Sequence, residues 1–185
     1  MDPVVSKLLD FTRFHTQTAP QLPNNFYNCD EYLPSILKRI IPAEVFGEIE
    51  KDLINFGERV VEEVAPLGQR AQLPHNFPHL YQYDGWGKRI DEIHVCDEWK
   101  KLHDISAEEG LVSLAYERKH GEYSRLHQFT KVLLFNPLSA IVSCPLSMTD
   151  GAARLIEQLY YSPESTITAF TPVCLFVFLL IVMFH

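Results

Sequence analysis

Histidines are the first residues in this sequence whose type and spacing suggest metal binding. The chain has eight of them, and His75 and His79 have the i, i+4 spacing that places two imidazoles on one face of a helix. Pro74 and Pro78 oppose such a helix, because proline removes a backbone donor and clashes with the preceding turn. The sequence therefore predicts a loop with two surface histidines, and no metal site.

Two further pairs, His94 with Glu98 and His103 with Asp104, have the composition of proton-transfer pairs. On an exposed amphipathic helix such pairs mostly favour solubility. The sequence lacks a GxSxG or GxGxxG motif, and its GWGK stretch is followed by arginine, which does not fit a phosphate-binding loop. The motifs alone thus predict no catalytic site.

The composition narrows the class of protein. A chain of 185 residues fits one domain, and its four widely spaced cysteines indicate reduced thiols, with neither a zinc site nor a disulfide framework. Lys and Arg number 16 against 24 Asp and Glu, and the net charge of −8 repels phosphate, so no nucleic-acid partner is expected. The first eighteen residues contain Asp2 and Asp10 and no continuous apolar run, which argues against a secretory signal or a mitochondrial transit peptide and favours the cytoplasm.

Helices must position whatever site the chain has. Asp30 is suited to cap a short helix, and Pro42 to open a long one that runs to Leu67. Along the long helix, apolar residues recur every three or four positions, which predicts one buried stripe: Phe46, Ile49, Leu53, Val60, Val64 and Leu67. The stretch from Leu67 to Leu80 is predicted to be a loop. Tyr81 to Val95 is predicted to be a small hairpin or an extended excursion, with turn residues at Asp84-Gly85.

A helical pattern resumes at DEWKKLHDI, and three more helix starts are expected after it. Ser106 and Glu109 have the spacing of a capping box, which predicts a helix start there. Another helix begins near Glu122 and is interrupted by Pro137, with apolar residues pointing one way: Leu126, Phe129, Leu133 and Ile141. After a turn SCPLSM, Thr149 or Asp150 is predicted to cap a last helix with a narrow face of Ala152, Ala153, Ile156 and Leu159. The expected fold class is mainly α.

Three stretches of sequence carry a family resemblance. They are YDGWGKRIDEIHVCDEWKKL, LAYERKHGEYSRLHQF and SCPLSMTDGAARLI. The chain resembles the N-terminal helical region of the AidB-like branch of the acyl-CoA dehydrogenase family. The matching positions are Tyr83, Asp84, Gly87, Lys88, Arg89, Ile90, Asp91 and Trp99, followed by Cys144, Pro145, Leu146, Ser147, Met148 and Thr149. Lys88 stands where the branch has arginine.

The resemblance implies a helical N-terminal domain, a middle β-domain with a flavin motif, and a C-terminal helical bundle that supplies the catalytic base. In such proteins, which are homo-oligomers, FAD is the cofactor of α,β-dehydrogenation of a fatty acyl-CoA. The turn around Cys144, Met148 and Thr149 would then line the pocket for the acyl chain. This sequence has neither the flavin motif nor the base, so we expect no FAD in this chain and no turnover by it alone.

After Glu164 the composition changes. We expect a helical domain over 1–164 and a hydrophobic tail over 165–185, in which Ser165 to Phe184 is uncharged and Val173 to Phe184 is entirely apolar. The length permits a transmembrane helix, but Pro172 leaves only about 21 Å of good helix against a hydrocarbon core of ~30 Å. The dozen apolar side chains favour insertion by several kcal/mol, on the order of 0.3 to 0.6 kcal/mol each, so we expect membrane association through residues 165–185. Docking on the helical domain and aggregation are the alternatives. A tail-anchored or interaction protein that binds a partner or an acyl chain is the alternative function, and a nonfunctional truncated product is a third.

Overall fold

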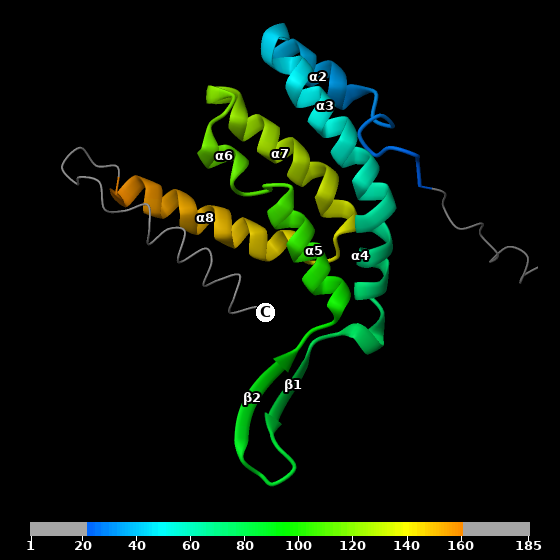
Figure 1. Ribbon diagram of the computed structural model, residues 1–185, viewed down its shortest axis with the longest axis vertical. Helices are drawn as coiled ribbons and strands as arrows, with labels where there is room; N and C mark the ends of the chain where they lie inside the picture. Colours follow the sequence, from blue (N-terminus) through cyan, green and yellow to red (C-terminus); the bar gives the residue numbers. More distant parts are fainter. Residues whose placement is uncertain (1–21, 161–185) are drawn as a thin grey trace, which may run out of the picture.

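The computed structural model describes residues 22–160, which form a set of packed helices and one hairpin (Figure 1). The helices are α2 (Tyr32–Ile40), α3 (Ala43–Arg59), α4 (Ala65–Ala71), α5 (Asp97–Glu108), α6 (Leu114–Glu117), α7 (Ser124–Phe135) and α8 (Ser143–Tyr160). Short helical turns lie at Pro74–Asn76, Gly121–Tyr123 and Asn136–Leu138. The strands β1 (His79–Tyr83) and β2 (Arg89–His94) pair antiparallel. The predicted mainly α domain with a small hairpin is confirmed.

The first two predicted helices form, and the second, long one has an irregularity near its end. The Asp30 carboxylate accepts the backbone N–H groups of Tyr32 and Leu33 at the start of α2. The helix that begins at Ala43 continues through a π-helical segment, Val60–Val64, into α4. Pro66 has no N–H to donate to the preceding turn, which accounts for a local change in the hydrogen-bond pattern beside it.

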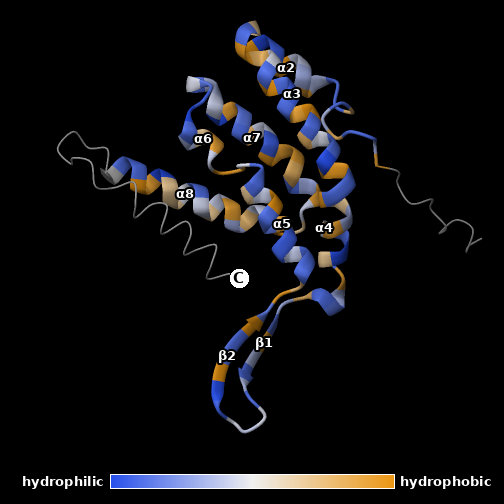
Figure 2. Cartoon of the chain, viewed as in Figure 1, coloured by the Kyte–Doolittle hydropathy of each residue, from blue (hydrophilic) through white to orange (hydrophobic). Residues whose placement is uncertain are grey.

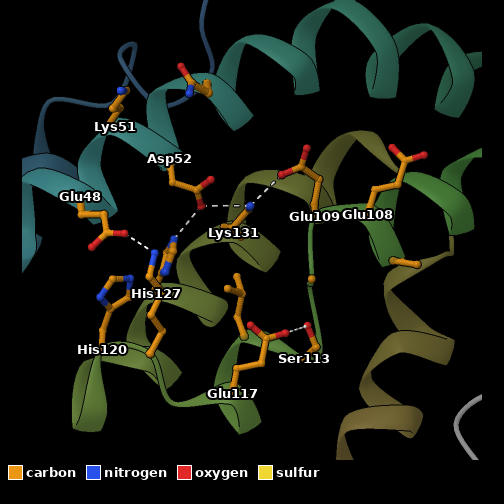
Figure 3. Close-up of a pocket in the computed structure, with 15 residues that line it drawn as sticks. Glu48, Lys51, Asp52, Glu108, Glu109, Ser113, Glu117, His120, His127 and Lys131 are labelled. Atoms are coloured by element: carbon orange, nitrogen blue, oxygen red, sulfur yellow. Dashed lines mark hydrogen bonds and ion pairs between the residues drawn. The ribbon is translucent and has the colours of Figure 1, made fainter. Parts of the chain in front are cut away.

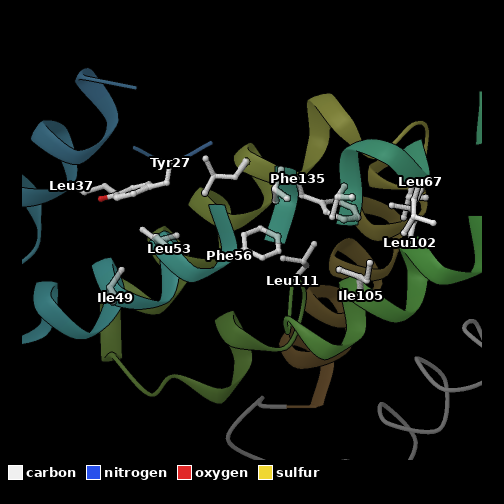
Figure 4. Packing of buried hydrophobic residues seen from close by; sticks show 14 of the residues in the cluster. Tyr27, Leu37, Ile49, Leu53, Phe56, Leu67, Leu102, Ile105, Leu111 and Phe135 are labelled. Atoms are coloured by element: carbon white, nitrogen blue, oxygen red, sulfur yellow. The ribbon is translucent and has the colours of Figure 1, made fainter. Parts of the chain in front are cut away.

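The core lies along this long helix (Figure 4). All six residues of the predicted apolar stripe are buried. Phe56 stacks on Phe135 of α7, with ring centroids 6.5 Å apart. Leu102 and Ile105 of α5 and Leu111 complete the cluster. The stripe therefore finds its partner in α5 and α7, which lie against the long helix.

The hairpin projects away from the helices (Figure 1). His79 pairs with His94 and Tyr83 with Arg89, with an irregularity between Tyr81 and Tyr83. The Asp84 carboxylate accepts the backbone N–H groups of Trp86 and Lys88, which orders the turn. The predicted hairpin is confirmed, and its tip presents Trp86 almost fully to solvent.

Two predicted helix boundaries are wrong. The expected loop after Leu67 begins only beyond Ala71, because Leu67 and Gly68 are buried and prolong the helix. Ser106 does not begin a helix: it is buried inside α5, and its hydroxyl donates to the carbonyl of His103. Helix α5 ends instead at Glu108, before Gly110, whose φ of +62° is left-handed and suits glycine.

A third boundary is also wrong, and it concerns the predicted site. The segment SCPLSM is not a turn but the beginning of α8, where Pro145 in the first turn costs no internal hydrogen bond. Thr149 is therefore inside the helix and caps nothing; its hydroxyl donates to the carbonyl of Pro145. The side chain of Asp150 is turned to Arg125 of α7.

The predicted apolar tail helix, 165–185, lies outside the described residues. None of the helices within 22–160 has the length and apolar character needed to cross a membrane.

Candidate functional site

An apolar surface lies where α7 leads into α8. We define the α7–α8 face by Phe129, Leu133, Cys144, Met148 and Leu155, all of which are exposed. A hollow of about 330 Å³ lies within it, and no charged side chain lines it. Its lining residues are Phe129, Val132, Leu133, Asn136, Ser143, Cys144 and Ser147. Figure 2 shows hydrophobic residues along α8, and the exposed ones among them include Met148 and Leu155.

The three residues predicted to line an acyl pocket all lie on α8, but their surroundings differ. Cys144 lines the hollow. Met148 lies one turn further along α8, with 70% of its surface exposed. Thr149 is half-buried and its hydroxyl is held by the helix backbone. The structure brings Cys144 and Met148 onto one face by their i, i+4 spacing, and the pocket role of all three stays a prediction.

A polar clamp fixes α8 against α6 and α7. Arg125 Nη1 lies 2.7 Å and 2.9 Å from the two carboxylate oxygens of Asp150. The Tyr116 hydroxyl donates to the same residue, at 2.8 Å to its carbonyl oxygen. The Arg125 guanidinium also lies over the rings of Tyr116 and Phe129, at 5.0 and 5.7 Å from their centroids. Because the Arg125 guanidinium contacts the ring of Phe129, the clamp helps to hold a residue of the α7–α8 face in position.

A second, polar cavity of about 620 Å³ lies between α3 and α7, beside the end of α5 (Figure 3). Carboxylates outnumber lysines in its lining. The charged and histidine residues around it are Glu48, Lys51, Asp52, Glu108, Glu109, Glu117, Lys119, His120, His127 and Lys131. Sequence reasoning missed this cavity, because a search for apolar periodicity does not mark polar residues that face inward.

Lys131 is the centre of an ion network in that cavity. Its side chain is only 3% exposed, and its ammonium lies 2.7 Å from Glu109 Oε2 and 3.1 Å from Asp52 Oδ2. His127 Nε2 lies 2.8 Å from the same Asp52 oxygen. Arg59 Nη1 binds the other oxygen of Glu109 at 2.6 Å. The network thus joins the long helix to α5 and α7, and its charges pair with one another rather than facing a ligand.

The pKa of Asp52 reflects this pairing. Burial alone would raise the pKa, but the hydrogen bond from His127 and the charge of Lys131 outweigh burial and lower the pKa to about 2. A carboxyl whose folded pKa is depressed stabilises the fold above its unfolded pKa of about 3.9, and this stabilisation is lost as the pH falls through the folded value. We therefore expect Asp52 to contribute on the order of 1 kcal/mol at neutral pH, after solvent screening, and to lose it between about pH 4 and pH 2.

The measurement is urea unfolding of the full chain and of Asp52→Asn from pH 2 to pH 6. The stability difference between the two should shrink over that interval. Glu58→Gln, at an exposed position of the same helix, is the control and should follow the wild type. A constant difference across the interval contradicts the assignment.

The pair His94 and Glu98 considered from the sequence does not form. His94, at the end of β2, lies 3.3 Å from Glu92, whereas Glu98 binds Arg70. Cys29, Cys96 and Cys144 are free thiols. Over 22–160, no three His, Cys, Asp or Glu side chains are grouped so that they could hold a metal ion.

Neither cavity fits the flavin cofactor that the resemblance implies. The hollow of the α7–α8 face is lined without a cation that could pair with a pyrophosphate. The polar cavity has lysines, but its carboxylates outnumber them and repel a phosphate group. The uncharged hollow, with Phe129, Val132 and Leu133 in its lining, suits a hydrocarbon chain instead.

Comparisons with known proteins agree with the resemblance. Residues 16–170 match the family described as Adaptive response protein AidB N-terminal domain. The chain is 42% identical over 145 residues to acyl-CoA dehydrogenase family member 11 of Caenorhabditis elegans, covering 78% of this chain and 23% of that protein. It is 25% identical over 152 residues to putative acyl-CoA dehydrogenase AidB of Escherichia coli (strain K12), covering 81% and 28%.

Two solved structures share the fold. C. elegans ACDH-11 in complex with C11-CoA matches with a TM-score of 0.73 at 41% identity, over 80% of this chain and 25% of that one. The apo form of Bd2924 matches with a TM-score of 0.71 at 42% identity, over 78% and 28%. Fold and sequence together define an N-terminal helical domain of the acyl-CoA dehydrogenase type. The chain belongs to the AidB N-terminal domain family, and it spans about a quarter of the length of the curated relatives it matches.

Proposed function

We propose that this chain is the N-terminal helical part of an AidB-like acyl-CoA dehydrogenase, with residues 1–164 as the domain, and that its α7–α8 face binds the fatty acyl part of an acyl-CoA. The observation that carries the proposal is the uncharged hollow between Phe129, Leu133 and Cys144. A hydrocarbon chain gains about 0.8 kcal/mol for each CH₂ group that it buries, and it needs no polar partner. The binding of C11-CoA by a relative of the same fold supports this substrate class.

Within this proposal, Cys144 and Met148 contact the acyl chain, and Thr149 acts indirectly through the helix that carries them. FAD and the catalytic carboxylate would belong to parts that the longer relatives have in addition, since neither of the two cavities described within residues 22–160 fits a flavin and the sequence has no flavin motif. The chain alone would therefore bind an acyl-CoA without dehydrogenating it.

Calorimetric titration of the full chain with C11-CoA tests the proposal. We expect saturable binding that Leu133→Asp, in the hollow, and Met148→Asp, one turn further along the same face, each weaken at least tenfold, because a carboxylate there must lose its hydration when the acyl chain binds. Coenzyme A without an acyl group should give no saturable heat.

Tyr32→Asp is the matched control. Tyr32 is 78% exposed on α2, away from the α7–α8 face, so this variant should bind like the wild type. Equal weakening by Tyr32→Asp, or binding of free coenzyme A as tight as that of C11-CoA, would show that the α7–α8 face is not the acyl site.

A further inference from the structure

We propose that the α7–α8 face is also the docking site of the chain's own segment Ser165–Phe184, which thereby competes with an acyl chain for the hollow. This inference goes beyond the proposed function, because it concerns a ligand that the protein carries itself. Three observations support it: the exposed apolar residues of the face, the uncharged composition of the segment, and the short stretch of chain that connects the segment to α8.

The face has the properties of a docking surface. Phe129, Leu133, Met148 and Leu155 are each more than half exposed, at 55%, 56%, 70% and 57%. Phe129 and Leu133 line the hollow, and Met148 and Leu155 lie further along α8. A group of exposed apolar residues of this kind differs from singly scattered surface residues and marks a binding site. The clamp of Arg125 and Asp150 holds both helices in place, so the face is formed before anything binds to it.

The segment has the matching chemistry. Its 20 residues carry no charge, and twelve in succession, Val173 to Phe184, are apolar. These twelve also lie beyond residue 170, where the match to the family ends. An uncharged apolar segment and a hollow lined without charge bury each other without leaving an unpaired ion.

The tether brings the segment within reach. Helix α8 ends at Tyr160, and from there back to Cys144 is about 24 Å along the helix axis. Cys174 follows Tyr160 by 14 residues, which span up to roughly 46 Å when extended. Because the two groups belong to one chain, docking is intramolecular and has a high effective concentration. A second copy or a lipid surface must compete with that advantage.

The native cysteines provide the test. Cys144 lines the hollow and Cys174 lies within the segment, whereas Cys29 and Cys96 lie outside the face. The full chain is treated with copper–phenanthroline, which takes up the two electrons released when two thiols form a disulfide, and is then digested without reduction for mass spectrometry. A disulfide requires Cα atoms within about 7 Å, so its yield reports the docked state.

We expect the Cys144–Cys174 disulfide to form at least tenfold faster than Cys29–Cys174 or Cys96–Cys174, at a rate independent of protein concentration. Leu133→Asp should slow it at least tenfold, and Tyr32→Asp should leave it unchanged. Disulfides between copies that increase with concentration would overturn the proposal in favour of a second copy. Loss of the Cys144–Cys174 disulfide on phosphatidylcholine vesicles that the chain co-floats with would overturn it in favour of membrane anchorage.

A double variant separates this inference from the proposed function. Leu175→Asp with Leu179→Asp should abolish the disulfide and raise the affinity for C11-CoA at least tenfold, because the hollow is freed of its internal competitor. A rise in affinity is the signature of competition. Unchanged affinity with intact acyl-CoA binding refutes the competition alone, and a strong disulfide without any acyl-CoA binding refutes the proposed function alone.

Discussion

Replacement of Lys131 by alanine is expected to destabilise the domain by about 3 kcal/mol. The side chain is 3% exposed and pairs with both Asp52 and Glu109, so its removal leaves two carboxylates next to each other without their shared cation. Breaking a fully buried ion pair costs about 3–5 kcal/mol, and we take the lower end because Asp52 remains 42% exposed. The ammonium also lies 4.8 Å from the centroid of the Phe56 ring, a contact that alanine loses.

Lys131→Met separates charge from packing, because methionine fills much of the same volume without the charge. We expect it to recover about 1 kcal/mol of the loss at most. Lys51→Ala, at an exposed lysine that lines the same cavity, is the control and should change the free energy of unfolding by less than about 0.5 kcal/mol. Urea unfolding followed by circular dichroism measures all three. If Lys131→Ala costs no more than Lys51→Ala, the network does not stabilise the fold.

The apolar pattern of the long helix was sufficient to predict which of its residues are buried in the core. The apolar pattern of α7 was not sufficient, because α7 buries residues of the ion network instead. Leu126, Phe129 and Leu133 do lie on one side of α7, but Phe129 and Leu133 are exposed. The buried side of α7 carries His127, Gln128 and Lys131 together with Leu134 and Phe135. Charged residues are normally at the surface, so only the partners that the fold brings from α3 and α5 explain their burial.

For the candidate site, the sequence indicated which residues to consider but not the local structure that carries them. The family resemblance directed attention to Cys144 and Met148, and α8 places them on one exposed face. Their role in an acyl pocket stays a prediction. The prediction that Pro145 lies in a turn is wrong, because a proline in the first turn of a helix is tolerated. Helical spacing rather than a turn therefore determines which side chains share the face.

Gly68→Ala is expected to destabilise the domain by about 3 kcal/mol, although alanine is the better helix former. A Cβ atom at Gly68 would lie 2.0 Å from the backbone carbonyl oxygen of Leu138, which is far closer than any non-bonded contact permits. Backbone cannot rotate away as a side chain can, so α4 and the turn between α7 and α8 must separate. That turn leads directly into Ser143 and Cys144, and its displacement should deform the hollow of the α7–α8 face.

Gly47→Ala is the matched control with the opposite sign. Gly47 lies within α3 with nothing inside 4 Å of an added Cβ, so alanine should stabilise the domain by about 0.5–1 kcal/mol through helix propensity alone. Urea unfolding of both variants measures the difference, and labelling of Cys144 with a thiol reagent reports the hollow. We expect faster or slower labelling in Gly68→Ala only. A neutral Gly68→Ala would mean that α4 and the 136–138 turn do not approach as closely as the contact at Gly68 requires.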